Sequence, residues 1–143
     1  MTVSAILRHK GHEVARVSPT ASIAEVSRSL TARRIGAVLV MDSADQLLGI
    51  VSERDIVCSL AEHGVRTLDM TAAQLMTRDL HIATPRTTVM EATEMMTHGR
   101  FRHLPVMEGD RLIGIVSIGD IVKARLEQQA QEVDSLKAYV SGG

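Results

Sequence analysis

Two segments of the chain place a serine three residues before an aspartate, directly after an apolar run. They contain Ser52 with Asp55 and Ser117 with Asp120. At a helix N-terminus the free backbone amides attract anions. One turn in, an ionised aspartate accepts hydrogen bonds from two neighbouring hydroxyls, as in a ribose diol, while the serine hydroxyl and the amides face a phosphate. The same spacing is an ordinary helix cap, and spacing alone leaves both interpretations open.

The two serine–aspartate pairs belong to a tandem repeat. Residues 47–57 and 112–122 are identical at eight of eleven positions, and the correspondence continues upstream. Gly49 and Gly114 precede the two pairs and allow close approach to the chain at these points. Two copies with a period near 65 residues do not suit a solenoid or a propeller. The repeat therefore predicts two similar half-domains packed face to face, with a cleft between them.

The hydrophobic pattern predicts the order strand, helix, strand, strand, helix in each copy. In the first copy the expected elements are a strand at 14–17, a helix opened by Ser22, strands at 37–41 and 47–51, and a helix opened by Ser52. Ser22 with Glu25, Thr88 with Glu91 in the second copy, and Thr71 with Gln74 between the copies have the spacing of a capping box. Apolar residues at helical spacing follow the first two boxes, and these stripes are Ile23, Val26 and Leu30 in the first copy and Val89, Ala92 and Met96 in the second. A short linking helix is expected at 71–76. This order predicts an α/β (α+β) fold.

Apolar residues continue beyond the second copy. Leu126, Val133 and Val140 recur every seven residues, so the last helix is expected to reach about Val140. A stripe that extends past the repeat needs a partner. It lies against its own domain or pairs with a second subunit, and the sequence leaves both alternatives open.

Composition favours an ordinary soluble domain. The chain has 143 residues, enough for a core without disulfides, and its single cysteine, Cys58, is expected in that core and not as a nucleophile. One cysteine fits a reducing compartment. The chain has no apolar run long enough for a membrane span, and its first fifteen residues lack the apolar centre of a signal peptide. We therefore expect a cytoplasmic protein without a membrane partner.

Charge and motif content argue against several other functions. A formal charge of −1 and two aromatic residues, Phe101 and Tyr139, provide neither a basic patch nor a stacking platform, so no nucleic-acid partner is expected. His9 and His12 are the only close histidine pair, and no second pair at zinc spacing accompanies them, so no metal site is expected. The sequence contains none of the common nucleophile, zinc-hydrolase or phosphate-loop motifs. We expect no catalytic residues and no enzyme activity.

Four cationic side chains are the nearest candidates for a phosphate contact: Arg54, Arg100, Arg102 and His103. The alternative for each is a solvated surface position. The two copies differ at this point, and the differing pairs are Gly36 with Arg102, Ala37 with His103, and Arg54 with Gly119. The two predicted sites are therefore chemically different.

Several motifs together resemble the CBS domain family. They are VSP at Val17 and ATP at Ala83, the segments RIGAVLV and RFRHLPV, and the doubled GIVSxxDIV. The resemblance covers nearly the whole chain, apart from about a dozen residues at the start and the tail after about Leu126, and is to the stand-alone bacterial type. It implies one CBS-pair module over 1–143, or Bateman module, with βαββα repeats at 14–68 and 78–126 related by pseudo-twofold symmetry. Residues 127–143 would be a C-terminal helical extension.

The resemblance also implies a ligand. Such pairs bind adenosyl compounds, here AMP, ATP or NAD(H), in one or both clefts between the repeats, without a catalytic cofactor, and usually form homodimers. The site of the second copy would use Thr84, Arg102, His103, Ser117 and Asp120, with Ser52 and Arg54 of the other repeat at the phosphate. The site of the first copy would use Ser18, Gly36, Ala37, Ser52 and Asp55, with Ser117, Arg100 and His103 across the cleft. Because Gly119 removes a side chain from the phosphate end of the first site, the Asp120 site is expected to be tighter.

These expectations combine into a regulatory role. A ligand that touches both repeats would bias their relative angle and alter conformation or the binding of a regulated partner protein, which the sequence does not name. The alternative is a ligand-free dimeric scaffold for protein interactions, with the C-terminal stripe as its working surface.

Overall fold

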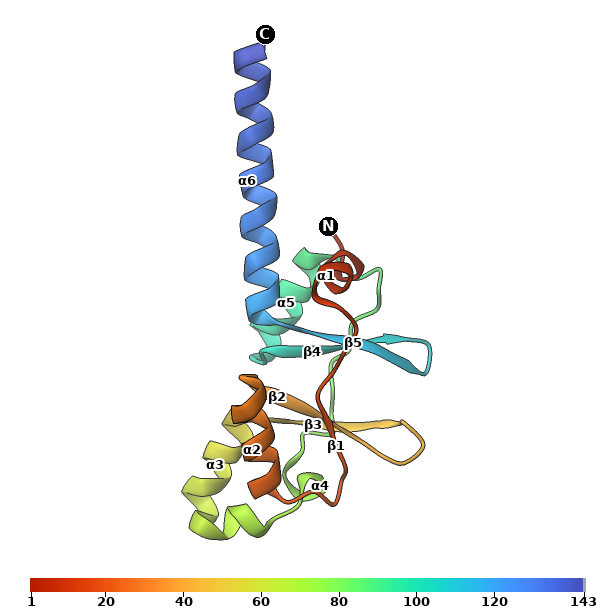
Figure 1. The fold of residues 1–143 in the computed structure, drawn as a ribbon, viewed down its shortest axis with the longest axis vertical. Coiled ribbons are helices and arrows are strands. Elements are labelled where there is room, and N and C mark those ends of the chain that lie inside the picture. Colours follow the sequence, from red (N-terminus) through yellow and green to blue (C-terminus); the bar gives the residue numbers. More distant parts are fainter. Residues whose placement is uncertain (143) are drawn as a thin grey trace. The chain divides into compact units, whose positions relative to one another are not determined.

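The computed structural model describes residues 1–142 and divides into two compact units. The first-repeat unit comprises residues 13–80 and 110–112. The second-repeat unit comprises residues 1–12, 81–109 and the described chain from 113 onward. Both units contain strands and helices, in agreement with the predicted α/β (α+β) class (Figure 1).

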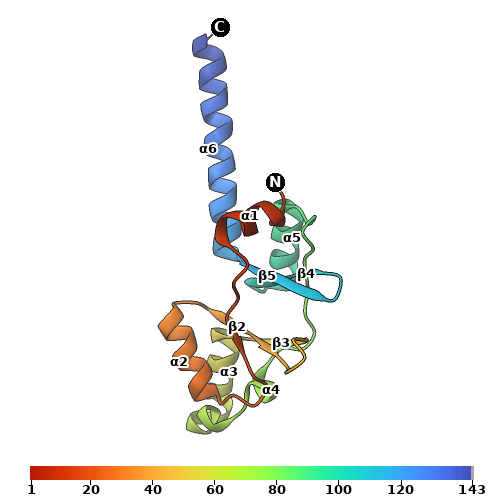
Figure 2. The ribbon, with the colours of Figure 1, turned by 45° about the vertical axis from the view of Figure 1, so that its right-hand side comes forward.

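The first-repeat unit is built on a three-stranded sheet with the order β1-β2-β3. Its strands are β1 (Arg16–Val17), β2 (Ala37–Met41) and β3 (Leu47–Ser52). β1 runs parallel to β2, and β2 runs antiparallel to β3, with Ala37 opposite Ser52. The helices are α2 (Ile23–Arg33), α3 (Glu53–His63), the 3-10 helix η1 (Gly64–Asp69) and α4 (Ala72–Leu75). Figure 2 shows α2 and α3 side by side next to this sheet.

The core of the first-repeat unit is aliphatic. The predicted helix stripe is confirmed, because Ile23, Val26 and Leu30 of α2 are all buried. These side chains pack with strand residues that are also buried, among them Val38, Val40 and Val51. The predicted strands at 37–41 and 47–51 are confirmed, whereas the expected strand at 14–17 is only two residues long.

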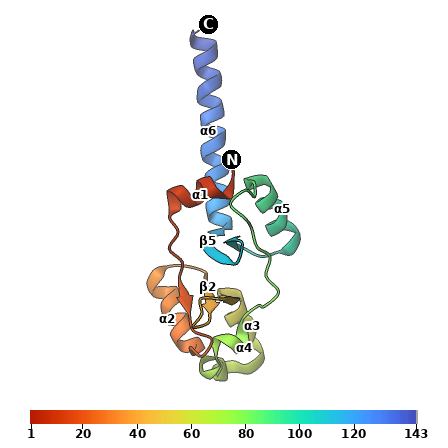
Figure 3. The same cartoon turned by 90° about the vertical axis from the view of Figure 1, so that its right-hand side faces the viewer.

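The second-repeat unit repeats this arrangement with a two-stranded sheet. Its elements are α1 (Val3–Lys10), α5 (Val89–Gly99), β4 (His103–Glu108), β5 (Arg111–Ser117) and α6 (Ile118–Gly142). The core again contains a predicted helix stripe, and its buried members are Val89, Ala92 and Met96 of α5. Figure 3 shows α1 and α5 beside the start of α6.

Helix α1 was not predicted, and it completes the core of the second-repeat unit. Val3, Ile6 and Leu7 are buried there. Leu7 lies so close to Gly114 that a Cβ added to this glycine would be 2.7 Å from Leu7 Cδ2. In the first-repeat unit, a Cβ on Gly49 would be 2.7 Å from Met76 Sδ, directly after α4. In each repeat, the glycine therefore allows a side chain from a helix, or from the residue directly after one, to approach the strand closely.

The predicted capping boxes are present, with one difference. Thr88 with Glu91 forms a complete box at α5, and Thr71 with Gln74 forms one at α4. At α2 the Ser22 side chain accepts a hydrogen bond from the Glu25 amide, but the reciprocal bond is not among those of the described residues. The helix starts were therefore predicted correctly, including this one.

The prediction for Cys58 was wrong. The residue is exposed, because the buried positions of α3 are Ile56 and Ser59. At 3.6 residues per turn, Cys58 lies on the opposite face of the helix from these two. The apolar background of this segment contains both faces of the helix and does not by itself identify the buried one.

Helix α6 is 25 residues long and continues past the rest of its unit (Figure 1). Its last buried residue is Ala124. The predicted stripe is therefore not covered by its own domain, since Leu126, Val133 and Val140 are all exposed. No helix within residues 1–142 is long and apolar enough to cross a membrane.

Candidate functional site

The two serine–aspartate pairs form equivalent capping boxes at the ends of β3 and β5. In the first-repeat unit the Ser52 amide donates to Asp55 Oδ2 at 2.8 Å, and the Asp55 amide donates to Ser52 Oγ at 3.3 Å. In the second-repeat unit the same two bonds join Ser117 and Asp120 at 2.8 Å and 3.2 Å. All four residues are half-buried. The capping interpretation is therefore correct for both pairs, but each carboxylate can accept further hydrogen bonds besides those of its cap.

Each carboxylate retains one oxygen that its cap does not use. The amides of Ser52 and Ser117 both donate to Oδ2 of their aspartate, and so do the Ser52 hydroxyl in the first-repeat unit and Lys10 in the second. A carboxylate oxygen accepts about two hydrogen bonds. Oδ1 of either residue can therefore accept donors from a small molecule while the cap remains intact.

The residues just before β2 lie at the start of α3, and those just before β4 lie at the start of α6. The Glu53 amide donates to the Gly36 carbonyl at 2.9 Å, and the Ile118 amide donates to the Arg102 carbonyl at 2.8 Å. Ala37 lies opposite Ser52 in the sheet. The structure thus brings Gly36 and Ala37, which the resemblance implied as site residues, to the Asp55 box. It also brings Arg102 to the Asp120 box.

Within residues 1–142, an ion pair reaches the Asp120 box and none reaches the Asp55 box. Lys10, the last residue of α1, donates from Nζ to Asp120 Oδ2 at 2.7 Å and to the Ile115 carbonyl at 2.8 Å. The exposed fractions of the two side chains are 33% for Lys10 and 23% for Asp120. This ion pair is partly shielded from water, so its attraction is stronger than that of a surface pair.

The ion pair lowers the pKa of Asp120. Burial raises the pKa of the Asp120 carboxyl, but hydrogen bonds from Lys10 and the Ser117 amide, together with the Lys10 charge, outweigh burial. The pKa of Asp120 is therefore below its ordinary value of 3.8. The carboxylate is ionised at neutral pH, as a ribose acceptor requires.

The matching position of the first-repeat unit lacks this cation. Leu7 contacts Gly114, and Met76 contacts the equivalent Gly49, so Leu7 and Met76 occupy equivalent places in the two repeats. Lys10 is three residues after Leu7, and its counterpart is the residue three places after Met76, which is Asp79. The two boxes thus share backbone geometry and differ in charge, which supports the prediction of two chemically different sites.

Two predicted site residues lie away from the box of their own unit. Ser18 follows β1, whose Val17 pairs with Val40, whereas Ser52 pairs with Ala37 at the other end of β2. At about 3.3 Å per residue and about 4.8 Å per strand, this separates Ser18 from Ser52 by roughly 15 Å. Thr84 is placed in the same way, because its neighbour Ala83 bridges to Val106 and not to the start of β4. Neither residue therefore lies in contact with the serine–aspartate pair of its own unit.

The cationic candidates divide by exposure. Arg54, Arg100 and Arg102 are exposed, and His103 is half-buried. Arg100 is the C-cap of α5, with a left-handed φ of 55°. Arg54 occupies the second position of α3, one residue before Asp55. Lys10, which no sequence argument selected, is a cation that the structure places at the Asp120 box.

One prediction concerns the charge of Asp120. In Lys10→Met the carboxyl keeps its burial and its Ser117 bond but loses the ammonium, so the pKa of Asp120 should rise. The measurement is an NMR titration of the side-chain carboxyl carbon, with Arg8→Met as a control that removes an exposed charge from the same helix. An Asp120 titration that is identical in wild type and Lys10→Met would contradict the ion pair.

The same shift sets the sign of a stability effect. Because the folded-state pKa is lowered, ionised Asp120 stabilises the fold above its unfolded pKa, and this contribution is lost as the pH falls from 3.8 through the lowered pKa. The difference in unfolding free energy between wild type and Lys10→Met should therefore be present at pH 7 and shrink in acid.

The repeat has a recognised counterpart in known proteins. Residues 3–62 and 72–127 match the model described as the CBS domain. This chain belongs to the CBS domain family. The first match begins at residue 3, so the CBS pair includes α1, which the sequence resemblance had left outside.

Relatives of this CBS pair are known in bacteria, archaea and plants. A CBS-domain containing protein from Agrobacterium tumefaciens has a solved structure with 44% identity and a TM-score of 0.85, covering 87% of this chain and 92% of that one. The mitochondrial CBS domain-containing protein CBSX3 of Arabidopsis thaliana is 34% identical over 85% of this chain. The chain spans 61% of the length of that plant protein. A CBS domain protein from Pyrobaculum aerophilum, complexed with AMP, is 26% identical with a TM-score of 0.74, covering 84% of this chain and 89% of that one.

Proposed function

We propose that this CBS pair is a non-catalytic regulatory module that binds an adenosyl nucleotide, with AMP as the first candidate and ATP and NAD(H) as the others. The Asp120 box carries the proposal. Its carboxylate is half-buried, has a pKa that Lys10 and Ser117 lower, and uses Oδ2 for these contacts, which leaves Oδ1 to accept from a diol. The AMP complex of the archaeal relative supports the choice of ligand.

The proposed contacts follow from the groups at the box. Asp120 accepts from the ribose hydroxyls, and the Ser117 hydroxyl and first amides of α6 face the phosphate. The chain beside Arg102 and His103 borders the adenine. By resemblance to the family, Ser52 and Arg54 of the first repeat also contact the phosphate, and the ligand lies in the cleft between the repeats. The Asp55 box, with Gly36 and Ala37, is proposed as a second and weaker site.

A ligand that binds both repeats acts by changing their preferred arrangement. The size of that change cannot exceed the difference in affinity between the two arrangements. We propose that this shift alters the binding of a partner protein, that the module works as a cytoplasmic homodimer, and that neither nucleic acid nor a membrane is its target.

The proposed function predicts ligand-dependent stability. At an AMP concentration near 100 times the dissociation constant, one site adds about 2.7 kcal/mol to the unfolding free energy, which a thermal melt detects. ATP, NAD and NADH are tested in parallel, with inorganic phosphate as the control for a nonspecific anion effect. The absence of a shift with all four nucleotides would contradict the proposal.

A second prediction separates the role of Lys10 from that of Asp120. The ammonium offsets the carboxylate charge that would otherwise repel a phosphate. Lys10→Met should therefore weaken AMP binding by about tenfold, with a smaller effect on uncharged adenosine. Isothermal titration calorimetry measures both ligands, and Arg8→Met again serves as the control. Equal losses for AMP and adenosine would show that Lys10 acts on the fold of the site and not on ligand charge.

The exposed stripe of α6 supports a second candidate function. A ligand-free dimeric scaffold would use the segment after Leu126 as its working surface, because that surface has no cover within its own unit. Removing this segment would then break assembly, while the ligand melts stay flat. The nucleotide proposal requires the melts to respond in both the full and the shortened chain.

A further inference from the structure

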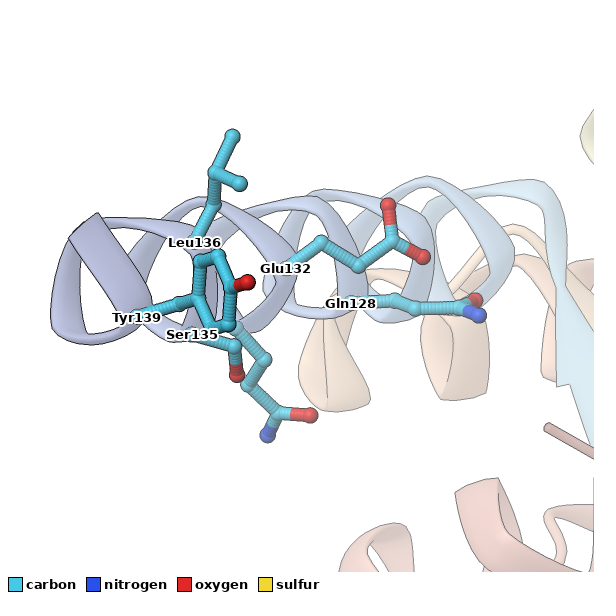
Figure 4. Close-up of a pocket in the computed structure, with 6 residues that line it drawn as sticks. Gln128, Glu132, Ser135, Leu136 and Tyr139 are labelled. Atoms are coloured by element: carbon cyan, nitrogen blue, oxygen red, sulfur yellow. The ribbon is translucent and has the colours of Figure 1, made fainter. Parts of the chain in front are cut away.

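From Val122 onward, α6 has apolar side chains that nothing in the described part of its unit covers. Val122, Leu126, Val133, Leu136 and Val140 have exposed fractions between 50% and 73%. Figure 4 shows the helix surface around Glu132, Leu136 and Tyr139, where an open pocket is lined only by residues of α6. A single helix of this length without tertiary contacts is only marginally stable in water. The segment therefore needs a partner along its apolar side.

The apolar positions follow a heptad. Counting from Val122, the side chains recur at alternating steps of four and three residues, and the members are Val122, Leu126, Gln129, Val133, Leu136 and Val140. In the heptad abcdefg, position a is occupied by Leu126, Val133 and Val140, and position d by Val122, Gln129 and Leu136. At 3.6 residues per turn, this seam lies roughly 130° around the helix from the midpoint of the buried Ile121 and Ala124. The helix can thus pack on its unit and present the seam at the same time.

We propose that residues 122–140 of α6 form a parallel two-stranded coiled coil with a second copy of this chain. Valine at two of the three a positions, with leucine at a d position, favours two strands. The proposal goes beyond nucleotide binding, because nothing in the seam depends on a ligand.

Charge decides for the parallel orientation. In a parallel pair, the g position of one helix faces the e position of the next heptad on the other. Glu132 is at g and Lys137 is at the matching e, so two attractive pairs form by symmetry. In the antiparallel pair that aligns the same apolar side chains, Glu132 faces its own copy, and Lys123 faces Lys137. Both antiparallel contacts are repulsive.

Gln129 sets the register. In the parallel, in-register pair it faces its own copy, and the two amide groups can hydrogen-bond to each other. In the antiparallel pair it faces Val133, which leaves a buried amide without a partner at a cost in stability. A single polar residue in an apolar seam selects one register in this way.

The test uses engineered disulfides in the full chain. The native Cys58 is first replaced by serine, which removes the competing exposed thiol. Gln129→Cys then places a thiol in the seam, and Gln131→Cys places one on the opposite side of the same helix, so the two glutamine variants are matched. Under oxidation, Gln129→Cys should form a covalent dimer about tenfold faster than Gln131→Cys, because only the seam thiols meet at disulfide geometry. Circular dichroism establishes that both variants fold.

Two results of the disulfide experiment would overturn the proposal. The first is an equal rate of covalent dimer formation for Gln129→Cys and Gln131→Cys. An antiparallel coil would instead give a mixed dimer of Gln129→Cys with Val133→Cys and little dimer of Gln129→Cys alone, which would also overturn it.

A charge exchange provides an independent check. Glu132→Lys should weaken self-association by about tenfold in sedimentation equilibrium, since two attractive contacts become repulsive. Adding Lys137→Glu to that variant should restore association. Failure of the second substitution to rescue the first would contradict the parallel pairing of these two positions.

Discussion

Replacing Asp120 with alanine should abolish the AMP-dependent rise in melting temperature. The substitution removes the acceptor for both ribose hydroxyls, and each hydrogen bond to a charged group contributes about 1.5–3 kcal/mol. Two such bonds correspond to an affinity loss of at least about 100-fold. At an AMP concentration that saturates wild type, the variant should be almost unliganded. Isothermal titration calorimetry gives the affinity directly.

Asp55→Ala is the matched control, because the two aspartates have the same cap geometry in different repeats. Both substitutions remove the carboxylate half of a capping box and therefore lower the stability of the ligand-free protein in the same way. Each melt is therefore compared with the ligand-free melt of the same variant. If Asp55→Ala loses AMP binding and Asp120→Ala keeps it, the tighter site is in the first repeat, and the assignment made here from Lys10 is wrong.

The sequence predicted the elements of this fold well because their signals are local and occur twice. Capping residues and apolar stripes at helical spacing located α2 and α5, and short apolar runs located β2 and β3. These features depend on neighbours within one turn of a helix or one strand. A pattern found at one place in the repeat could then be checked at the equivalent place in the other.

The sequence did not predict α1, although this helix has a structural counterpart at α4 in the other repeat. Thr2 bridges to Thr88 in the same way that Thr71 bridges to Ser22, and Leu7 and Met76 contact equivalent glycines. The likeness between these two helix segments is structural, and few of their residues are identical. A comparison by residue identity therefore ends before them.

The charge of the site depends on contacts between residues far apart in the chain. Lys10 and Asp120 are separated by 110 positions, and no spacing rule connects them. For the same reason, the family resemblance grouped Ser18 and Thr84 with the aspartate of their own repeat. The strand register moves them to the other end of the sheet.

Leu7→Ala should destabilise the second-repeat unit by about 3 kcal/mol, because a fully buried leucine is lost and a cavity remains. For a chain of this length, that corresponds to a melting temperature lowered by about 6–12 °C. Arg8→Ala, on the exposed side of the same helix, should change the melting temperature little. A small effect of Leu7→Ala would mean that α1 contributes little to the core.

The contact between Leu7 and Gly114 allows a sharper test. Gly114→Ala alone forces the new Cβ to within 2.7 Å of the leucine, so the leucine must move, which costs about 1–3 kcal/mol. In the Leu7→Ala background, the same methyl group enters the space that the leucine left. The second substitution should then cost much less, or even stabilise, and the double-mutant cycle should give a coupling energy of about 1 kcal/mol or more. Additive effects would show that α1 does not pack on this glycine in solution, and the Lys10 contact that depends on α1 would fall with it.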